Sequence, residues 1–215
     1  MKILKSLSDD PVRNLALERE LLTERTEEFV LLYINRSAVI VGRNQSPAAE
    51  ADLELCRRRG IPVLKRISGG GTVYHDHGNI NWSFITARGT VPLLDSRPHR
   101  PIVEALGAMG VETAVGPRGE LTTGGRKISG TASYVTGQRQ LFHGTLLYDT
   151  DLDAMRLALR GNSAERGRRI ASVPSETANL RPLLPRFDTP RAFLDSLAAM
   201  LAINCNAGKP EAVMF

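Results

Sequence analysis

The residues best suited to chemistry gather in a glycine-rich segment in the first half of the chain. Arg66 and Ser68 precede the glycine triplet 69–71, and two histidines, His75 and His77, follow it. Because glycine has no Cβ, a bulky anion could lie directly against the backbone N–H groups of the triplet. A guanidinium ahead of the triplet adds a planar fork of donors that suits phosphate. The alternative that these residues leave open is a glycine-rich hairpin whose turn needs positive φ.

A second candidate for chemistry is Lys127, which follows Gly-Gly-Arg and begins a predicted strand running into Ser129 and Gly130. From the start of a strand an ammonium could reach into a cleft. There it would neutralise a carboxylate and an α-phosphate as the two combine. The alternative is a lysine that faces solvent, which is the usual position of this residue type.

Other chemistries fit the spacing less well. A dinucleotide-binding fingerprint would need a glycine where Tyr74 stands, and a Walker A loop begun at Gly119 meets its lysine too late in the sequence. His75 and His77 would share one face of a strand, so a metal pair is conceivable. No helix-spaced set of ligands accompanies them, and we therefore expect no metal held by protein side chains.

The composition is that of an ordinary globular domain. Hydrophobic residues make up 42% and charged residues 24% of the 215 positions, so we expect a single domain with a full core. No apolar run approaches the roughly 20 residues that span a bilayer. The charged N-terminus does not resemble a secretory signal, and the two cysteines, Cys56 and Cys205, fit a reducing compartment as small hydrophobes. These features predict a cytoplasmic protein without a membrane partner.

The excess of basic over acidic residues does not by itself identify a partner. The formal net charge is +5, but aromatic residues are only 5% and no block of five or six basic residues occurs. Short clusters at 57–59 and 166–169 fit solvated faces or a docking surface for an acidic partner better than a nucleic-acid site.

Hydrophobic periodicity and turn residues predict the elements that must position these residues. Helices are expected at 14–22, 48–59 (with Ser46 as N-cap and Gly60 at its end), 99–109, 151–159 and 191–203. Strands are expected at 29–34 and 38–41 as a hairpin, at 63–67, from 73, at 80–85, at 111–115, and at 127–135 and 140–148 joined at Gly137. Residues 89–98 form a connection with two prolines. Since strands do not alternate cleanly with helices, an α+β fold with a mainly antiparallel sheet is favoured.

At this point several segments resemble lipoate–protein ligases of the biotin/lipoate ligase superfamily. The main matches are Arg66 to Asn79 (RISGGGTVYHDHGN), Gly125 to Ala132 (GRKISGTA) and His143 to Leu147 (HGTLL). Supporting matches lie at 14–18, 41–45 and 172–180, so the resemblance runs in family order over about residues 14–185. It implies an α+β catalytic domain with a mainly antiparallel sheet flanked by helices.

The resemblance also implies an activity and a set of roles. Lipoate and ATP, with Mg²⁺, would give lipoyl-AMP and pyrophosphate, and the lipoyl group would pass to a lysine of an acidic lipoyl-domain acceptor. Lys127 is the implied catalytic residue. The implied nucleotide-binding residues are Arg66, Gly71, Thr72, Val73, Tyr74 and Lys127. The implied lipoate-binding residues are Ser68, Gly69, Gly70, His75, Asn79, Ser129, Gly130, His143 and Thr145.

Two departures from the family pattern and two other functions stay open. Gly119 stands where the family has an asparagine, which removes a hydrogen-bonding side chain. We expect no C-terminal accessory domain after this catalytic domain, in which case a separate accessory protein would be a partner. An octanoyl or lipoyl transferase would need a cysteine near 116–120 or 162–173, where none occurs. A non-catalytic module that binds lipoate or lipoyl domains is the other alternative.

Overall fold

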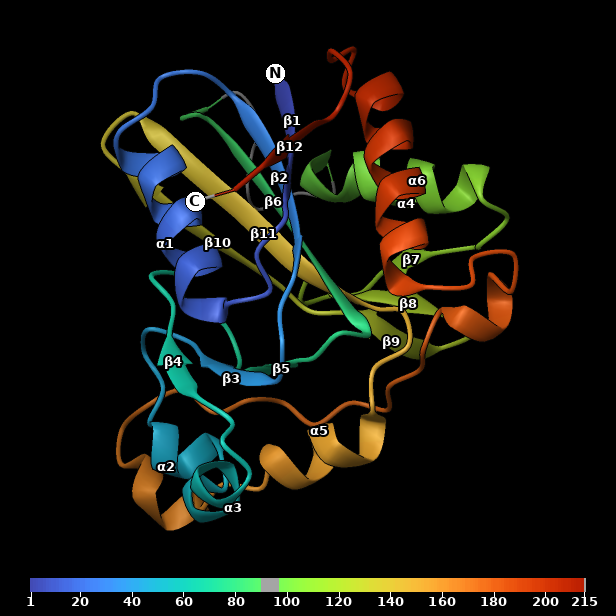
Figure 1. Cartoon of the computed structure of the whole chain (residues 1–215). Helices are drawn as coiled ribbons and strands as arrows, with labels where there is room; N and C mark the ends of the chain where they lie inside the picture. The colour runs from blue at the N-terminus through green and yellow to red at the C-terminus, as the bar shows by residue number, and fades with distance from the viewer. Residues whose placement is uncertain (90–96, 215) are drawn as a thin grey trace.

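The computed structural model describes residues 1–89 and 97–214. Its largest sheet runs through the middle of the molecule, with helices on both faces (Figure 1). In spatial order the strands are β10 (Thr131–Thr136), β11 (Arg139–Leu147), β6 (Asn79–Ala87), β2 (Phe29–Ile34), β1 (Lys2–Ser6) and β12 (Glu211–Val213). The four strands from β10 to β2 pair antiparallel, whereas β1 pairs parallel with both β2 and β12. The predicted α+β class with a mainly antiparallel sheet is therefore confirmed.

The central strand β6 shows how the sheet serves both core and site. It is buried from Asn79 to Thr86, because elements cover both of its faces. Side chains alternate between the faces of a strand, and Ile80, Trp82 and Phe84 join the larger core cluster. The opposite face carries polar residues at Asn81 and Ser83. One face of the sheet is thus core, and the other is available for a site.

Three helices cover the large sheet (Figure 1). Helices α4 (Arg100–Ala108) and α6 (Pro190–Asn204) pack on the face of Trp82 and contribute Leu106 and Leu197 to that core. Helix α1 (Pro11–Thr23) lies on the other face, where Leu17, Leu21 and Leu22 pack against Phe29 and Leu31. The Asp10 carboxylate caps α1 by accepting from the amides of Val12 and Arg13.

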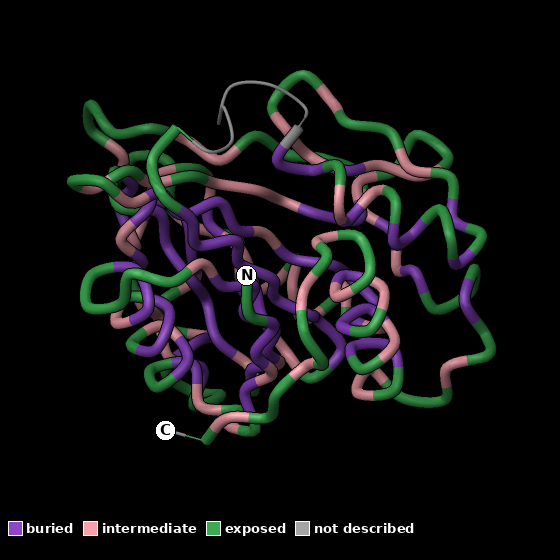
Figure 2. The backbone as a smooth tube through the Cα atoms, turned by 90° about the horizontal axis from the view of Figure 1, so that it is seen from above, coloured by how far each residue is buried: buried purple, intermediate pink, exposed green. Residues whose placement is uncertain are grey.

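Two smaller sheets flank the end of the large one. Strand β3 (Ala38–Val41) lies between β4 (Val63–Lys65), to which it is parallel, and β5 (Val73–His75), to which it is antiparallel. The helices α2 (Pro47–Glu50), α3 (Leu53–Arg58) and α5 (Leu152–Ala158) lie beneath this sheet in Figure 1. The other sheet consists of β7 (Ala114–Val115), β8 (Leu121–Thr123) and β9 (Arg126–Ser129). Short 3-10 turns occur at η1 (Arg97–His99), η2 (Ser163–Arg166) and η3 (Arg181–Leu183). In Figure 2 the buried stretches lie in the interior of the molecule, and the exposed ones lie at its periphery.

Most of the predicted elements are present, and the exceptions have a physical reason. The predicted hairpin of 29–34 with 38–41 is wrong: β2 pairs with β1 and β6, whereas β3 turns away into the smaller sheet. The hairpin reading of the glycine triplet is also wrong, because β4 and β5 flank β3 and do not pair with each other. The glycines therefore belong to a loop that crosses from one edge of this sheet to the other.

Three further predictions need adjustment. The helix expected at 48–59 is two helices, because the chain is extended at Ala51 and restarts at Asp52, whose carboxylate caps α3. The strand expected at 127–135 is divided at Gly130 between the β7–β8–β9 sheet and the large sheet. The strand expected at 111–115 is reduced to β7. The connection predicted for 89–98 lies mostly outside the described residues.

The helices expected at 14–22, 99–109, 151–159 and 191–203 are confirmed within a few residues as α1, α4, α5 and α6. Within residues 1–89 and 97–214, every helix is too short or too polar to cross a bilayer.

Candidate active site

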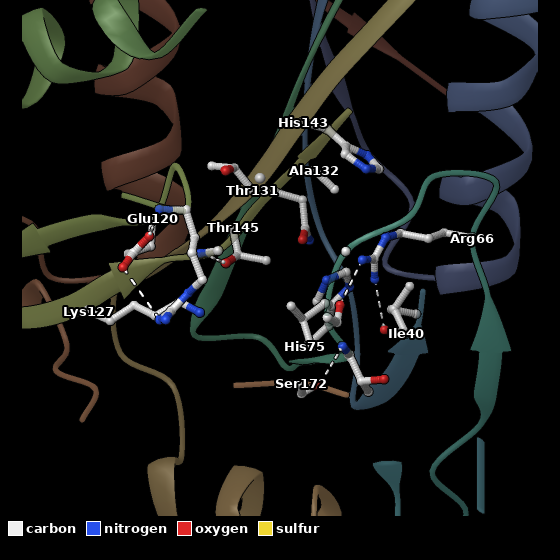
Figure 3. A pocket seen from close by; sticks show the side chains of 18 of the residues that line it. Ile40, Arg66, His75, Glu120, Lys127, Thr131, Ala132, His143, Thr145 and Ser172 are labelled. Atoms are coloured by element: carbon white, nitrogen blue, oxygen red, sulfur yellow. Dashed lines mark hydrogen bonds and ion pairs between the residues drawn. The ribbon is translucent and has the colours of Figure 1, made fainter. Parts of the chain in front are cut away.

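A cavity of about 310 Å³ lies where the glycine loop meets the polar face of the large sheet. Its walls come from the glycine loop, from β9 to β11, and from the segment Ile170–Val173. Figure 3 shows Lys127 and Glu120 on one side and Arg66 on the other, with Thr131, Ala132 and Thr145 between them. A volume of this size suits a small organic ligand.

Arg66 holds the glycine loop in shape. Its Nη2 donates to the carbonyl oxygens of Gly69 at 2.5 Å and Gly71 at 2.7 Å. Its Nη1 donates to the Ile40 carbonyl at 3.1 Å, and its Nε donates to Ser68 Oγ at 2.9 Å. A guanidinium has five N–H groups, so four of them are used by the protein itself. The expected phosphate fork is therefore mostly a clamp on the loop, with one N–H left for a ligand.

The charge on Arg66 survives its burial. Burial lowers the pKa of Arg66 to about 10, although the nearby Glu18 carboxylate works against that shift. Because this value remains well above neutral pH, the guanidinium stays protonated. The cavity therefore has a permanent positive charge beneath the glycine loop.

The glycine loop offers backbone donors to the cavity. Gly70 and Gly71 line it, and no residue in the described ranges accepts a hydrogen bond from either of their amides. The loop is fixed from outside by Ser172, whose Oγ accepts from the Thr72 amide at 2.9 Å. Gln45 donates to the same Oγ at 3.1 Å. Free amides in a fixed loop, beside a guanidinium, can bind an anion without rearranging.

Gly42 is required for this loop position. A Cβ on Gly42 would overlap the carbonyl oxygen of Gly70, a backbone atom that cannot swing aside. We expect Gly42→Ala to displace the loop and to lower the rate of any reaction in the cavity by about 100-fold, since small misplacements are costly. Gly107→Ala is the matched control, because a Cβ there meets nothing within 4 Å and α4 gains a better helix former. Equal activity of the two variants in a steady-state assay would refute this requirement.

Lys127 reaches the same cavity from β9. Its backbone is held on both sides, since it pairs with Thr122 and its amide donates to the Glu176 carbonyl at 2.9 Å. The side chain bends over Gly130, where a Cβ would lie 3.5 Å from Nζ. Within the part of the chain that the structure describes, no hydrogen bond or ion pair reaches Nζ.

Burial lowers the pKa of the Lys127 ammonium, and the nearby Glu120 carboxylate partly offsets that effect. Glu120 itself is occupied by the Arg118 amide, which donates to Oε2 at 3.0 Å. A half-buried ammonium without a partner is costly to maintain. It therefore points to an anionic ligand in the cavity.

His143 is held on both ring nitrogens. Its Nδ1 lies 2.8 Å from Oε2 of Glu18, a carboxylate on α1, and its Nε2 lies 2.7 Å from Ser68 Oγ. Ser83 Oγ donates to the same carboxylate at 2.5 Å. Burial opposes the charge of Glu18, but His143 and Ser83 outweigh it and keep the pKa of Glu18 below its usual value. His143 thus links α1, the large sheet and the glycine loop.

The structure brings most of the predicted site residues together. Those that line the cavity are Arg66, Gly70, Gly71, Thr72, Val73, His75, Lys127, Gly130, His143 and Thr145. The predicted site residues that do not line it are Ser68, Gly69, Tyr74, Asn79 and Ser129. Asn79 donates to Asn81 Oδ1 at 3.0 Å, and it is Asn81 that lines the cavity.

Sequence reasoning missed several lining residues, among them Tyr33, Ile40, Asn81, Ala132 and Ile170–Val173. The alternation along β6 and β2 could have identified Asn81 and Tyr33, which are direct cross-strand neighbours. Glu18 and Ser172 lie within the matching segments 14–18 and 172–180, but their residue types alone predict no role for either.

The two histidines considered as a metal pair lie in different surroundings. His75 is buried, whereas His77 is exposed and bonds Asp9 at 3.0 Å. Among the described residues, no group of three or more His, Cys, Asp or Glu side chains is arranged to hold a metal ion.

Comparison with solved structures defines the class of fold. A lipoate-bound putative lipoate protein ligase from Thermoplasma acidophilum superposes with a TM-score of 0.80 at 19% identity, over 100% of this chain and 89% of that one. The T. acidophilum bipartite ligase, studied with its E2 lipoyl domain, gives 0.80 at 20% identity over 99% and 86%. A lipoate-protein ligase A bound with ATP gives 0.81 at 20% identity over 99% and 88%. The fold is that of a lipoate-ligase catalytic domain.

The family follows from the sequence. The family model described as the lipoyl protein ligase A/B catalytic domain matches residues 10–202, and the chain belongs to this family. Lipoate–protein ligase 1 of Staphylococcus aureus is 39% identical over 81% of this chain and 55% of its own length. Lipoate-protein ligase LplJ of Bacillus subtilis is 34% identical over 88% and 58%. The chain therefore spans little more than half the length of these curated relatives.

Proposed function

We propose that the chain is an adenylate-forming lipoate–protein ligase, with residues 1–215 acting as its catalytic domain. In the first step a carboxylate oxygen of lipoate attacks the α-phosphorus of ATP, and the bond to pyrophosphate breaks. In the second step a lysine amine of a lipoyl domain attacks the acyl carbon, and AMP leaves. The observation that carries the proposal is the unpaired Lys127 ammonium opposite the free amides of Gly70 and Gly71.

Each group has a role in this chemistry. The amides of Gly70 and Gly71 bind phosphate oxygens, and Arg66 keeps them in place while adding positive charge. The Lys127 ammonium neutralises the carboxylate and the α-phosphate as the mixed anhydride forms. Walls from β10, β11 and Ile170–Val173 keep water from the anhydride. We propose that Mg²⁺ arrives bound to the phosphates of ATP, as it commonly does.

The test is lipoate-dependent exchange of pyrophosphate into ATP, followed by lipoylation of a lipoyl domain detected by mass. We expect exchange with lipoate and none without it. A parallel reaction includes any separately encoded accessory-domain protein, which we propose as a partner for the adenylation step. Absence of lipoyl-AMP in both reactions would reject the ligase function.

The same assay separates the alternatives. A transferase would form an acyl thioester, but Cys56 is buried in α3 and burial raises the pKa of both the Cys56 and Cys205 thiols. Neither cysteine lines the cavity. A non-catalytic module would bind lipoate tightly and form no adenylate. Two free cysteines are also compatible with the reducing cytoplasm, where we propose that the protein works.

We further propose that the acceptor is an acidic lipoyl domain that docks beside the cavity. Arg118 lines the cavity, and the exposed Arg126 and Arg169 are chain neighbours of the lining residues Lys127 and Ile170. Acyl transfer should therefore fall several-fold as salt rises through the range where the Debye length shrinks from about 10 to 3 Å, while pyrophosphate exchange changes little. Arg169→Gln should weaken this salt dependence, and Arg57→Gln, on α3, is the control. Transfer that is independent of salt would contradict electrostatic docking.

A further inference from the structure

A line of buried polar side chains leads from the loop before α1 to the ring of His75. Asn14, on α1, donates from Nδ2 to the Ser8 carbonyl at 2.9 Å and to Asn35 Oδ1 at 2.7 Å. Asn35, which follows β2, has its Nδ2 2.9 Å from Nδ1 of His75. Asn14, Asn35 and His75 are at most 3% exposed, and His75 is one of the residues that line the cavity. Helix α1, the end of β2 in the large sheet and strand β5 of the β4–β3–β5 sheet are therefore joined through His75.

The direction of this chain of hydrogen bonds is fixed at its origin. The Ser8 carbonyl can only accept, so the Asn14 atom that faces it must be the amide nitrogen. The same nitrogen faces Asn35, whose facing atom must then be oxygen. Asn35 consequently turns its own NH₂ group toward His75. At the other end Ser6 Oγ donates to Asn14 Oδ1 at 2.6 Å, in agreement with this assignment.

The protonation of His75 follows from this direction. Because Asn35 donates to Nδ1, that nitrogen is bare, and the single ring proton must be on Nε2. Burial lowers the pKa of His75 to about 3, and the positive charge of Arg66 adds to the shift. Among the described residues, the hydrogen bond of the His75 ring is the one at Nδ1, and none reaches Nε2. The ring is thus a neutral donor with its N–H free.

His143 provides a contrast inside the same cavity. Its Nδ1 faces the Glu18 carboxylate, which can only accept, so that nitrogen carries a proton. The two cavity histidines therefore differ in which nitrogen is protonated. The Asn35 amide places the proton of His75 on Nε2, whereas the Glu18 carboxylate places the proton of His143 on Nδ1.

We propose that Asn14 and Asn35 are positioning residues that hold His75 as a neutral Nε2–H donor to an oxygen of the bound acyl group. The proposal rests on the ligase function proposed above. A neutral donor orients the acyl oxygen without adding a third full positive charge beside Arg66 and Lys127. Such a charge would stabilise the free carboxylate as much as the transition state, and would not raise the rate.

The first experiment is ¹⁵N NMR of the histidine ring nitrogens in the unmodified chain at neutral pH, without substrate. We expect His75 to show a bare Nδ1 and a protonated Nε2. A protonated Nδ1, or an imidazolium, would overturn the proposal. Because no substrate is present, this result is independent of whether the protein is a ligase.

The second experiment uses Asn35→Asp, which keeps the shape of the side chain but replaces its NH₂ by an acceptor. His75 should then carry a proton on Nδ1. Lipoate-dependent pyrophosphate exchange should fall by about 10- to 100-fold, the usual effect of losing a hydrogen bond to a charged or polarised group, with the KM for ATP unchanged. A changed ring with unchanged exchange would overturn the positioning role.

Two further variants distinguish a change in the His75 tautomer from a general disturbance of the fold. Ser6→Ala leaves the Ser8 carbonyl in place as the origin of the chain, so the His75 tautomer and the exchange rate should be retained. His75→Gln keeps a neutral N–H donor and cannot change tautomer. Adding Asn35→Asp to His75→Gln should therefore cost much less than it costs in the unmodified chain. Equal costs in the two backgrounds would contradict the proposal.

Discussion

Lys127→Ala is expected to slow lipoate-dependent pyrophosphate exchange by about 10²- to 10³-fold while leaving the fold intact. The ammonium is the only full charge from β9 that lines the cavity, and no described residue pairs with it. Removing one group that stabilises developing charge commonly costs about 10²- to 10³-fold in rate. The free energy of unfolding should stay within about 0.5 kcal/mol or rise slightly, because the desolvation cost of an unpaired ammonium disappears. Exchange kinetics and urea unfolding on the same samples measure both quantities.

Arg126→Ala is the matched control for this variant. Arg126 is the preceding residue of β9 and is exposed, so its removal should leave both exchange and unfolding almost unchanged. If Lys127→Ala and Arg126→Ala behaved alike, or if Lys127→Ala unfolded the protein, the assigned role of Lys127 would be wrong.

Arg66→Ala is expected to lose activity and stability together. Its side chain satisfies the buried carbonyls of Ile40, Gly69 and Gly71 and the hydroxyl of Ser68. Leaving such groups without donors should cost at least about 3 kcal/mol of unfolding free energy, because each buried acceptor left unsatisfied costs about 1–3 kcal/mol. Exchange should fall to background, because the loop amides lose their fixed positions. Urea unfolding followed by circular dichroism measures the first effect.

Arg66→Lys distinguishes the effect of the hydrogen bonds that hold the glycine loop from the effect of the positive charge. A lysine keeps the positive charge but cannot reach four acceptors in a planar fork. It should therefore resemble Arg66→Ala in stability, whereas Arg43→Ala, at an exposed neighbouring arginine, should resemble the unmodified protein. Full stability of Arg66→Lys would show that the guanidinium geometry is not what holds the loop.

Residue types in this sequence carry a prediction of the site's chemistry, but they do not carry its geometry. Residue types around Arg66, the glycine triplet and Lys127 were enough to predict an anion site, because backbone donors and cations carry that information locally. The sequence does not predict that the Arg66 guanidinium binds backbone carbonyls, because one of its acceptors, Ile40, lies in a strand that is distant in sequence. A planar fork aimed at phosphate and one aimed at carbonyls look the same in sequence.

The strand pairing shows the same limit. Residues 29–34 and 38–41 have the pattern of a hairpin, yet β2 joins the large sheet and β3 joins the smaller one. The choice is made by partners from elsewhere in the chain, β6 for the first and β4 and β5 for the second. Asn35 lies in the three-residue link between them and bonds both Asn14 and His75. These long-range contacts turn an expected tight turn into a crossing between sheets.

The most direct test of the central claim is a crystal structure of the chain with a non-hydrolysable lipoyl-adenylate analogue. We predict that the Lys127 ammonium lies within hydrogen-bond distance of the linkage between the acyl and phosphoryl groups, with the Gly70 and Gly71 amides toward the nucleotide. An analogue bound elsewhere, or one whose linkage lies far from Lys127, would contradict the convergence of these groups on one mixed anhydride.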